Sequence, residues 1–539
     1  MSSEKREASP EASPLKGPAP KAVPEDTSDV AFEDGIPLSP MAADPSVQFI
    51  SGTPANGDAK VEIGDSGIAP TFVGLGKEEL MKYANDPFWV RLRWFLFILF
   101  WVLWLAMLVG AIVIIILAPR CAEKKMATET FYQIKAADLI KDNEQIDAQT
   151  QYLKDMGVMT VIISDVLKHD PSSEPEAVTD LKALDETINE DVFTATIKKM
   201  RNEGMTVLMQ LVPNHVAITH EWFNDLEKSD YFVREPYNNV SKSVWVTQDR
   251  KGNAWTVDPN NDQKAYLHQF SGNVADLNFR NDDIISYFKG ALSDWRLKKI
   301  DGFVISKASF LVENLDNLMS SEATRNSPKN VEVIKQIVGI TSGPVLVELD
   351  LASEETINQY IGQGLTPVVK SVDTANASRI EETLEVLSKI PDVVINLSPK
   401  PPSTPEKARL INLLAIAGGS HALLNHESAQ GDKEFLKNLV KFQQDNPKVK
   451  STTVQHSSID NFVAVLRSDG DDRHLIIANV GNTPATFSPQ GSNITESAAG
   501  KIILATPNAG LSNGSVTQDE VSLPMLSGVI IKLGNKPSE

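Results

Sequence analysis

The chain has 539 residues and a formal net charge of −20, from 71 acidic and 51 basic side chains. Its length allows one large domain with appendages. A strongly acidic surface repels the phosphate backbone of nucleic acids, so the composition argues against a nucleic-acid partner. Residues 1–70 are rich in Pro, Ser, Ala, Asp and Glu and poor in aromatic residues. Such a segment buries too little apolar surface to offset its ordering entropy, so we expect a mostly disordered tail.

The longest apolar stretch is Trp94–Ala118, which contains no charge and no proline. As an α-helix of about 1.5 Å per residue it would span roughly 37 Å, enough to cross the hydrocarbon core of a bilayer. A buried core helix or a cleaved signal peptide fits less well, because the stretch is long and starts far from the N-terminus. We therefore expect a signal-anchor in the lipid bilayer, with a cytosolic tail at 1–93 and a juxtamembrane linker at 119–130.

The orientation of this anchor is predicted from glycosylation triplets, because the Lys and Arg residues on its two flanks are nearly balanced. Five N-x-S/T triplets follow the anchor and none precedes it: Asn239, Asn376, Asn396, Asn493 and Asn513. We expect a type II protein with its C-terminal part outside the cell. We also expect glycans on all of these residues except Asn396, which ends a predicted strand and has Pro399 after its triplet.

Beyond the linker, short apolar runs alternate with amphipathic stretches, a pattern typical of parallel strands joined by right-handed helical crossovers. The expected strands are Phe131–Ile134, Met159–Ile163, Met205–Leu211, Gly302–Ser306, Pro344–Glu348, Pro367–Ser371, Asp392–Asn396 and His421–Leu424. The expected helices are Glu144–Lys154, Phe193–Asn202, Asp283–Trp295, Val331–Val338, Glu354–Ile361, Ala377–Ser388, Pro405–Ile416 and Lys433–Gln444. Eight units favour a closed (β/α)₈ TIM barrel at 131–450, with an insertion at 216–280, over an open doubly wound sheet.

From about Ser451 the helical pattern stops and the remaining chain predicts an antiparallel β-domain at 451–539. Its expected strands are Phe462–Leu466, His474–Val480, Lys501–Leu504 and Gly528–Leu533. Gly, Asn and Pro residues between them are typical of turns. The expected fold is therefore one transmembrane helix, an α/β barrel and a C-terminal β-domain.

Several motifs at the predicted strand ends resemble those of the α-amylase and α-glucosidase superfamily. They are Gln210-Leu-Val-Pro-Asn214-His215, Tyr266-Leu-His-Gln-Phe, Asp276-Leu-Asn-Phe, Asp301-Gly-Phe-Val304-Ile-Ser306, Glu348 after an apolar strand, and Asn396-Leu-Ser398. The resemblance covers residues 130–539 and implies a barrel whose active site lies at the carboxyl ends of the strands.

The resemblance also implies that the catalytic groups are missing. Retaining glycosidases use a carboxylate nucleophile and a carboxylic acid that protonates the leaving oxygen. Here Ser306 stands at the nucleophile position and Val304 at the arginine position beside it, while Ser398 replaces the third carboxylate. Gln210 replaces the first-region aspartate, which leaves Glu348 alone. We expect no glycoside hydrolysis and interpret Glu348 as a solvated residue of the barrel rim.

No other catalytic set is recognisable in the sequence. It has no phosphate-binding loop, zinc-ligand spacing or dinucleotide fingerprint, so we expect neither a metal nor a cofactor. Asn214 and His215 are expected to make structural hydrogen bonds at a strand end.

Cys121, directly after the anchor, is the single cysteine of the chain. With no partner in its own chain it is either bonded to another molecule or free, and an oxidising compartment favours an intermolecular disulfide. Palmitoylation is the alternative and requires the opposite topology. Ala106 and Gly110, four residues apart within the anchor, offer a small-residue face on which another helix can pack, although they could also simply face lipid.

These features together resemble the heavy-chain glycoproteins of heteromeric amino-acid transporters. The matching segments are Phe72-Val-Gly-Leu-Gly-Lys-Glu-Glu-Leu80, Trp89-Val-Arg-Leu-Arg-Trp94 and Ala118-Pro-Arg-Cys121. The resemblance implies a plasma-membrane subunit, disulfide-linked to a multi-pass light chain that carries the substrate path. A membrane-anchored α-glucosidase and an adhesion or receptor ectodomain are the alternative interpretations.

Overall fold

The computed structural model describes most of the chain after residue 80. The described residues are 81–82, 85–117, 130–139, 143–339, 343–350, 353–370, 376–390, 393–397, 404–418, 421–429, 432–446, 453–459, 461–489, 492 and 494–534. The chain divides into two units, Met1–Ala118 and Pro119–Glu539. Cys121, Ser398 and Asn493, three of the predicted functional residues, lie outside the described residues.

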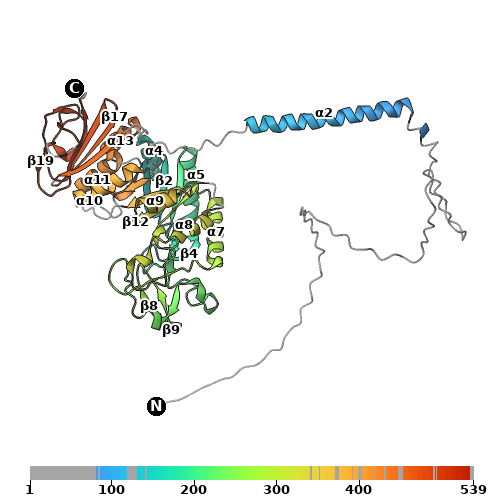
Figure 1. Cartoon of the computed structure of the whole chain (residues 1–539), viewed down its shortest axis with the longest axis horizontal. Coiled ribbons are helices and arrows are strands. Elements are labelled where there is room, and N and C mark those ends of the chain that lie inside the picture. Colours follow the sequence, from blue (N-terminus) through green and yellow to red (C-terminus); the bar gives the residue numbers. More distant parts are fainter. Residues whose placement is uncertain are drawn as a thin grey trace, which may run out of the picture. The chain divides into compact units, whose positions relative to one another are not determined.

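The first unit contains one long helix, α2, at Pro87–Leu117 (Figure 1). Its segment Pro87–Ala111 has a mean hydropathy of 2.4 and is long and apolar enough to cross a membrane. The helix begins seven residues before the expected start at Trp94. Asp86 explains this start, because its Oδ1 accepts a hydrogen bond from the Phe88 N–H at 2.9 Å and Pro87 occupies the first helical position.

The second unit is built on a closed barrel of eight parallel strands (Figure 1). In barrel order they are β1 (Thr130–Lys135), β15 (His421–Asn425), β14 (Val394–Asn396), β13 (Thr366–Lys370), β12 (Val345–Asp350), β11 (Gly302–Ile305), β5 (Thr206–Leu211) and β2 (Thr160–Ser164). All eight expected strands are confirmed, and the open-sheet alternative is wrong because β1 pairs with both β2 and β15.

Amphipathic helices alternate with these strands, as the sequence predicts. They are α4 (Asn143–Asp155), α5 (Glu190–Asn202), α7 (Asp282–Leu297), α8 (Pro328–Val338), α9 (Glu354–Ile361), α10 (Ala377–Lys389), α11 (Pro405–Gly418) and α13 (Lys433–Asp445). Side-chain caps set several helix starts: Asn189, Asn281 and Ser327 each accept hydrogen bonds from N–H groups of the first turn. Short helices α3 (Ala136–Leu139) and α12 (His426–Ala429) directly follow β1 and β15.

The barrel lumen contains one layer of apolar side chains, with one residue from each strand. These residues are Phe131, Ile162, Leu208, Val304, Leu346, Val368, Val394 and Leu423, and none is more than 2% exposed. Because side chains alternate between the two faces of a strand, the next inward side chain lies two residues further along each strand. That geometry determines which residues form the site described below.

Additional strands are inserted into the barrel after β2 and after β5. The first, unpredicted, is the hairpin of β3 (Leu167–His169) and β4 (Val178–Leu184) after β2. The second is the expected insertion after β5. It contains β6 (His215–Ala217) paired with β10 (Val274–Asp276), the short helix α6 (Tyr237–Val240), and a sheet of β7 (Arg234–Pro236), β9 (Asn261–Leu267) and β8 (Trp255–Asp258).

The C-terminal part forms the expected antiparallel β-domain (Figure 1). Its main sheet has the order β16 (Thr453–Ile459), β17 (Phe462–Asp469), β18 (Asp472–Asn479), β23 (Ser527–Leu533), β20 (Gly500–Ala505) and β21 (Val516–Thr517). A second pair joins β19 (Ala485–Phe487) to β22 (Val521–Leu523). The sequence did not predict β16, β19, β21 or β22. The main sheet packs on α10 and α11.

Candidate functional site

A layer of polar side chains lies at the carboxyl ends of the barrel strands, two residues beyond the apolar layer. The eight positions are Gln133, Ser164, Gln210, Ser306, Glu348, Lys370, Asn396 and Asn425. The strands are parallel, so their carboxyl ends meet at one mouth of the barrel, which is where enzymes of this fold build their active sites. This polar layer is therefore the candidate functional site.

Five of these residues form one continuous hydrogen-bond network. Gln133 Nε2 donates to Gln210 Oε1 at 2.9 Å, and Gln210 Nε2 donates to Ser306 Oγ at 2.7 Å. Ser306 Oγ donates to Glu348 Oε2 at 2.5 Å. Lys370 Nζ lies 2.7 Å from the same carboxylate oxygen, and Gln210 Nε2 approaches it to 3.3 Å. The network crosses five strands and converges on Glu348.

The expectation that Glu348 is a solvated rim residue is wrong. Glu348 is 2% exposed and paired with Lys370, whose side chain is 24% exposed. The sequence misled because β12 continues two residues beyond Glu348, to Asp350. Strand alternation turns Glu348 into the lumen, while Val347 and Leu349 on either side join the outer core.

The protonation state of Glu348 follows from these contacts. Burial acts to raise the pKa of the Glu348 carboxyl, but the Lys370 cation and the hydrogen bonds from Ser306 and Gln210 outweigh it and hold the pKa below its usual value. A general acid has to carry a proton at the working pH. The network therefore favours a buried carboxylate, rather than a carboxylic acid, at Glu348.

The other predicted positions fit this description where the structure describes them. Val304 belongs to the apolar lumen layer, and Ser306 is 2% exposed with its hydroxyl bonded to Glu348. Asn396, at the end of β14, is also 2% exposed, which agrees with the expectation that it carries no glycan. Leu397 after it is buried as well.

Asn214 and His215 make the expected structural hydrogen bonds. Asn214 Nδ2 donates to the Phe310 carbonyl oxygen at 2.6 Å, and its Oδ1 lies 3.0 Å from His215 Nδ1. Both residues are 1% exposed. Burial, helped by the nearby Lys307, lowers the pKa of His215 well below its usual value, so its ring stays neutral.

The sequence analysis missed another buried site, where the carboxyl groups of Asp276 and Glu313 lie between the insertion and the loop after β11. Gln269 Nε2 donates to Asp276 Oδ2 at 2.8 Å and to Glu313 Oε1 at 3.1 Å. Burial raises the pKa of Glu313 to about 7, against the opposing effect of Arg280. Burial and then the charge of Glu313 raise the pKa of Asp276 well above its usual value. The motifs Tyr266-Leu-His-Gln-Phe and Asp276-Leu-Asn-Phe pointed to this place, but not to Glu313.

The sequence also missed Lys370 and Gln133, which lie on strands without a recognisable motif. The inward alternation along β13 would have placed Lys370 beside the acid, had the strand register been known. Over the part of the chain that the structure describes, no group of three or more His, Cys, Asp or Glu side chains is arranged to hold a metal ion.

The described glycosylation candidates are exposed. Asn239 lies in α6. Asn376 precedes α10, and its Oδ1 accepts hydrogen bonds from the N–H groups of Ser378 at 3.0 Å and Arg379 at 3.3 Å. Asn513 lies between β20 and β21, with its Oδ1 bonded to the Ala505 N–H at 3.1 Å. In these two residues the side-chain oxygen makes the contact, which leaves Nδ2, the glycan-bearing atom, uncommitted by these bonds.

The anchor helix α2 has two unlike faces. Trp94, Trp101 and Trp104 follow one face, and Trp101 and Trp104 stack edge to face with ring centroids 5.5 Å apart. At 3.6 residues per turn, Ala106 and Gly110 lie on the opposite face. A Cβ atom added at Gly110 would meet nothing within 4 Å. The two faces of α2 therefore differ in the size of their side chains.

Comparison with solved structures identifies proteins of the same fold. Isomaltulose synthase from Klebsiella sp. LX3 superposes with a TM-score of 0.59 at 13% identity, over 75% of this chain and 98% of that protein. Bacillus licheniformis trehalose-6-phosphate hydrolase gives a TM-score of 0.58 at 12% identity, over 75% of this chain and 99% of that protein. The closed barrel, its insertion and the β-domain therefore share their fold with these two enzymes.

Two family models match consecutive parts of the chain. The model described as the solute carrier family 3 member 2 N-terminus matches residues 58–133, and the alpha amylase catalytic domain matches residues 132–364. The resemblance to amino-acid transporter heavy chains predicted from the sequence is confirmed, because the two models match in the order N-terminal segment and then amylase-like domain.

Individual relatives include both transporter subunits and enzymes. The amino acid transporter heavy chain SLC3A2 of Oryctolagus cuniculus is 29% identical over 186 residues, which cover 32% of this chain and 34% of that protein. The heavy chain SLC3A1 of Homo sapiens is 27% identical over 46% of this chain and 38% of that protein. The salivary alpha-glucosidase of Aedes aegypti is 24% identical over 48% and 51%, respectively. The chain thus spans about a third of the length of the heavy chains that it matches.

Proposed function

We propose that this protein is a non-catalytic heavy subunit of a heteromeric amino-acid transporter. It is a single-pass type II protein of the plasma membrane, with residues 1–93 in the cytosol and the barrel and β-domain outside. It pairs with a multi-pass light chain, which carries the amino acids, and it delivers that light chain to the membrane and stabilises it there. The names of the SLC3A2 and SLC3A1 relatives support this assignment.

The observation that carries the non-catalytic part is the network around Glu348. Double displacement needs an ionised nucleophile and a protonated acid on either side of the scissile bond. Here the nucleophile position is the hydroxyl of Ser306, and the acid position is a carboxylate paired with Lys370. Both side chains are 2% exposed, and they are hydrogen-bonded to each other.

The light chain is proposed to be held by two kinds of contact. Cys121 supplies an interchain disulfide, because in an oxidising compartment the single cysteine of the chain has only another molecule to pair with. The Ala106 and Gly110 face of α2 supplies helix packing inside the bilayer, where small residues allow two backbones to approach closely. The disulfide then mainly raises the effective concentration of a pair that already fits.

The partner assignment is tested by non-reducing electrophoresis of the cell-surface protein, with mass spectrometry of the high-mass band. We expect the band to contain a multi-pass transporter and to disappear in Cys121→Ser, while a large part of the complex still co-purifies in mild detergent. Gly110→Leu in the Cys121→Ser background should remove that remainder, and Val109→Leu is the matched control on another face of α2. A high-mass band that survives Cys121→Ser would contradict the disulfide.

A receptor or adhesion role would give the same orientation without a light chain. If no multi-pass protein co-purifies with the wild-type chain in mild detergent, the subunit proposal is wrong and the adhesion interpretation replaces it.

A further inference from the structure

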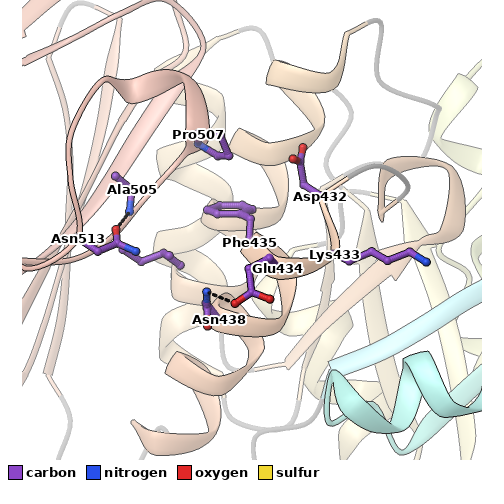
Figure 2. Close-up of a pocket in the computed structure, with 9 residues that line it drawn as sticks. Asp432, Lys433, Glu434, Phe435, Asn438, Ala505, Pro507 and Asn513 are labelled. Carbon is purple, nitrogen blue, oxygen red and sulfur yellow. Dashed lines mark hydrogen bonds between the residues drawn. The ribbon is translucent and has the colours of Figure 1, made fainter.

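A hollow of about 540 Å³ lies between helix α13 of the barrel and the loops of the β-domain (Figure 2). The lining residues are Asp432, Lys433, Glu434, Phe435, Asn438, Leu504, Ala505, Pro507 and Asn513. The volume falls in the range of about 300–1,000 Å³ that is typical of small-ligand cavities. One of the lining residues, Asn513, begins an N-x-S/T triplet.

The side chain of Asn513 is oriented by its own hydrogen bond. Its Oδ1 accepts from the Ala505 N–H at 3.1 Å, and Figure 2 shows this bond at the edge of the hollow. The chain turns immediately afterwards at Gly514, whose φ is +86°. This bond uses the side-chain oxygen, so it leaves Nδ2, the atom that bears a glycan, at the edge of the hollow.

The lining has the mixed chemistry that binds a sugar ring. The Phe435 ring, which is 6% exposed, and the exposed Pro507 offer apolar surface to the C–H face of a pyranose. Glu434 and Asn438 offer a carboxylate and an amide to its hydroxyl and acetamido groups. Asn438 Nδ2 reaches Glu434 Oε1 at 3.4 Å, a long bond between exposed groups that a sugar can readily replace.

We propose that this hollow seats the first N-acetylglucosamine of a glycan on Asn513 and so links α13 to the β-domain. The proposal rests on the outside orientation given above. In the modification, Asn513 Nδ2 displaces the diphosphate of a lipid-linked oligosaccharide at C1 of the sugar and loses one proton. The glycan is therefore a structural contact between two parts of the ectodomain as well as a surface modification.

Asn239 provides the internal comparison. It is an exposed residue of the short helix α6 and does not line this hollow. The hydroxyl of each triplet donates to a nearby carbonyl oxygen, Ser241 Oγ to Asn238 at 3.3 Å and Ser515 Oγ to Ser512 at 2.6 Å. Ser241→Ala and Ser515→Ala therefore each remove one glycan together with one local hydrogen bond.

The test is site-resolved removal of glycans from the native, cell-surface protein with peptide-N-glycosidase in ¹⁸O-water, followed by mass spectrometry. A seated first sugar shields the scissile amide, so we expect removal at Asn513 to be about tenfold slower than at Asn239, as for a site that is open about one-tenth of the time. Denatured protein should release both glycans at the same rate.

Two variants of α13 test whether slow removal of the Asn513 glycan comes from binding of its first sugar in the hollow or from general shielding of the site. Asn438→Trp fills the hollow and should bring the native rate at Asn513 up to that at Asn239, whereas Lys437→Trp, an exposed change outside the lining, should leave it slow. Ser515→Ala should lower the thermal unfolding temperature more than Ser241→Ala does.

Two results would contradict binding of the sugar in the hollow. One is equal rates of glycan removal from Asn513 and Asn239 in the native protein. The other is slow removal at Asn513 that Asn438→Trp does not change. An unmodified Asn513 beside a modified Asn239 would also overturn the seating, while leaving the orientation intact. If neither residue carries a glycan, the proposed orientation and the seating fail together.

Discussion

Two buried carboxylate sites in the second unit of the chain differ in the protonation state that their surroundings favour. At the barrel mouth, Glu348 is paired with Lys370 and its pKa is lowered despite burial. Between the insertion and the barrel, Glu313 and Asp276 share the amide of Gln269, and burial raises the pKa of both. The surroundings of Glu348 favour the ionised form of its carboxyl group, and those of Glu313 and Asp276 favour the protonated form.

This difference bears directly on the proposal that the barrel does not hydrolyse glycosides. A retaining glycosidase needs one ionised and one protonated carboxyl group across a single scissile bond. In this protein both electrostatic types exist, but they lie in separate sites with separate hydrogen-bond networks. Burial alone therefore does not set the protonation state: at Glu348 the Lys370 cation and the hydrogen bonds outweigh burial, whereas at Glu313 the Arg280 cation does not.

The largest effect is expected when the charged site loses its cation. Lys370→Met leaves the buried Glu348 carboxylate unpaired, which should cost about 3 kcal/mol of folding stability at neutral pH. Thermal unfolding of the detergent-solubilised chain measures this loss. The double variant Lys370→Met/Glu348→Gln should recover much of it, and Lys389→Met, at an exposed ion pair, should change little. A double variant as unstable as the single one would show that packing, rather than charge, is what Lys370 supplies.

The second prediction concerns the proton-holding site and the pH dependence of stability. The folded-state pKa of Glu313 is raised to about 7 from 4.5, so the folded protein holds a proton that the unfolded chain has lost between these values. The stabilisation is complete below pH 4.5 and is lost as the pH rises through 7, a total of about 3 kcal/mol as an upper bound. Asp276 acts in the same direction.

Glu313→Gln should flatten this dependence, because the amide keeps the shape of the side chain without titrating. Unfolding temperatures measured between pH 5 and pH 8 test it, with the exposed Glu322→Gln as the control. If the unfolding temperature of the wild-type protein rises between pH 5 and pH 8, and Glu313→Gln has the same pH dependence, Glu313 does not hold a proton in the folded state.

Arg467 extends the comparison to a buried cation. Its partners are carbonyl groups rather than a carboxylate. Its guanidinium donates to the carbonyl oxygens of Ala417 at 3.2 Å and Asn446 at 2.9 Å, and burial lowers its pKa to about 10. Arg467→Met removes the charge and leaves two carbonyl groups without these donors, so a loss of about 2 kcal/mol is expected. Arg473→Met on β18 is the control, and equal losses in the two variants would remove this role for Arg467.

The sequence predicted the repeating parts of this molecule better than its contacts. The eight barrel strands and their helices followed from local periodicity, which a short stretch of chain contains. The burial of Glu348 could not be predicted from local periodicity, because it depends on the register of β12 against β13 and on Lys370 of that neighbouring strand. The start of α2 was missed for a local reason, the Asp86 cap.

The β3 and β4 hairpin and strand β16 were missed because their residues alternate weakly between apolar and polar. Leu167–His169 has three residues, too few for a period to show. Thr453–Ile459 is mostly polar and becomes a strand by pairing along its whole length with β17. Tertiary pairing, rather than local preference, determines such strands.

The most direct measurement for the non-catalytic assignment is turnover of maltose and of an aryl α-glucoside by the purified protein. We predict no rate above a buffer blank at any pH from 5 to 8. Ser306→Asp should not create one, because Val304 remains at the arginine position and Glu348 remains paired with Lys370. A steady rate that disappears in Glu348→Gln would contradict this account and identify the barrel as a working glycosidase.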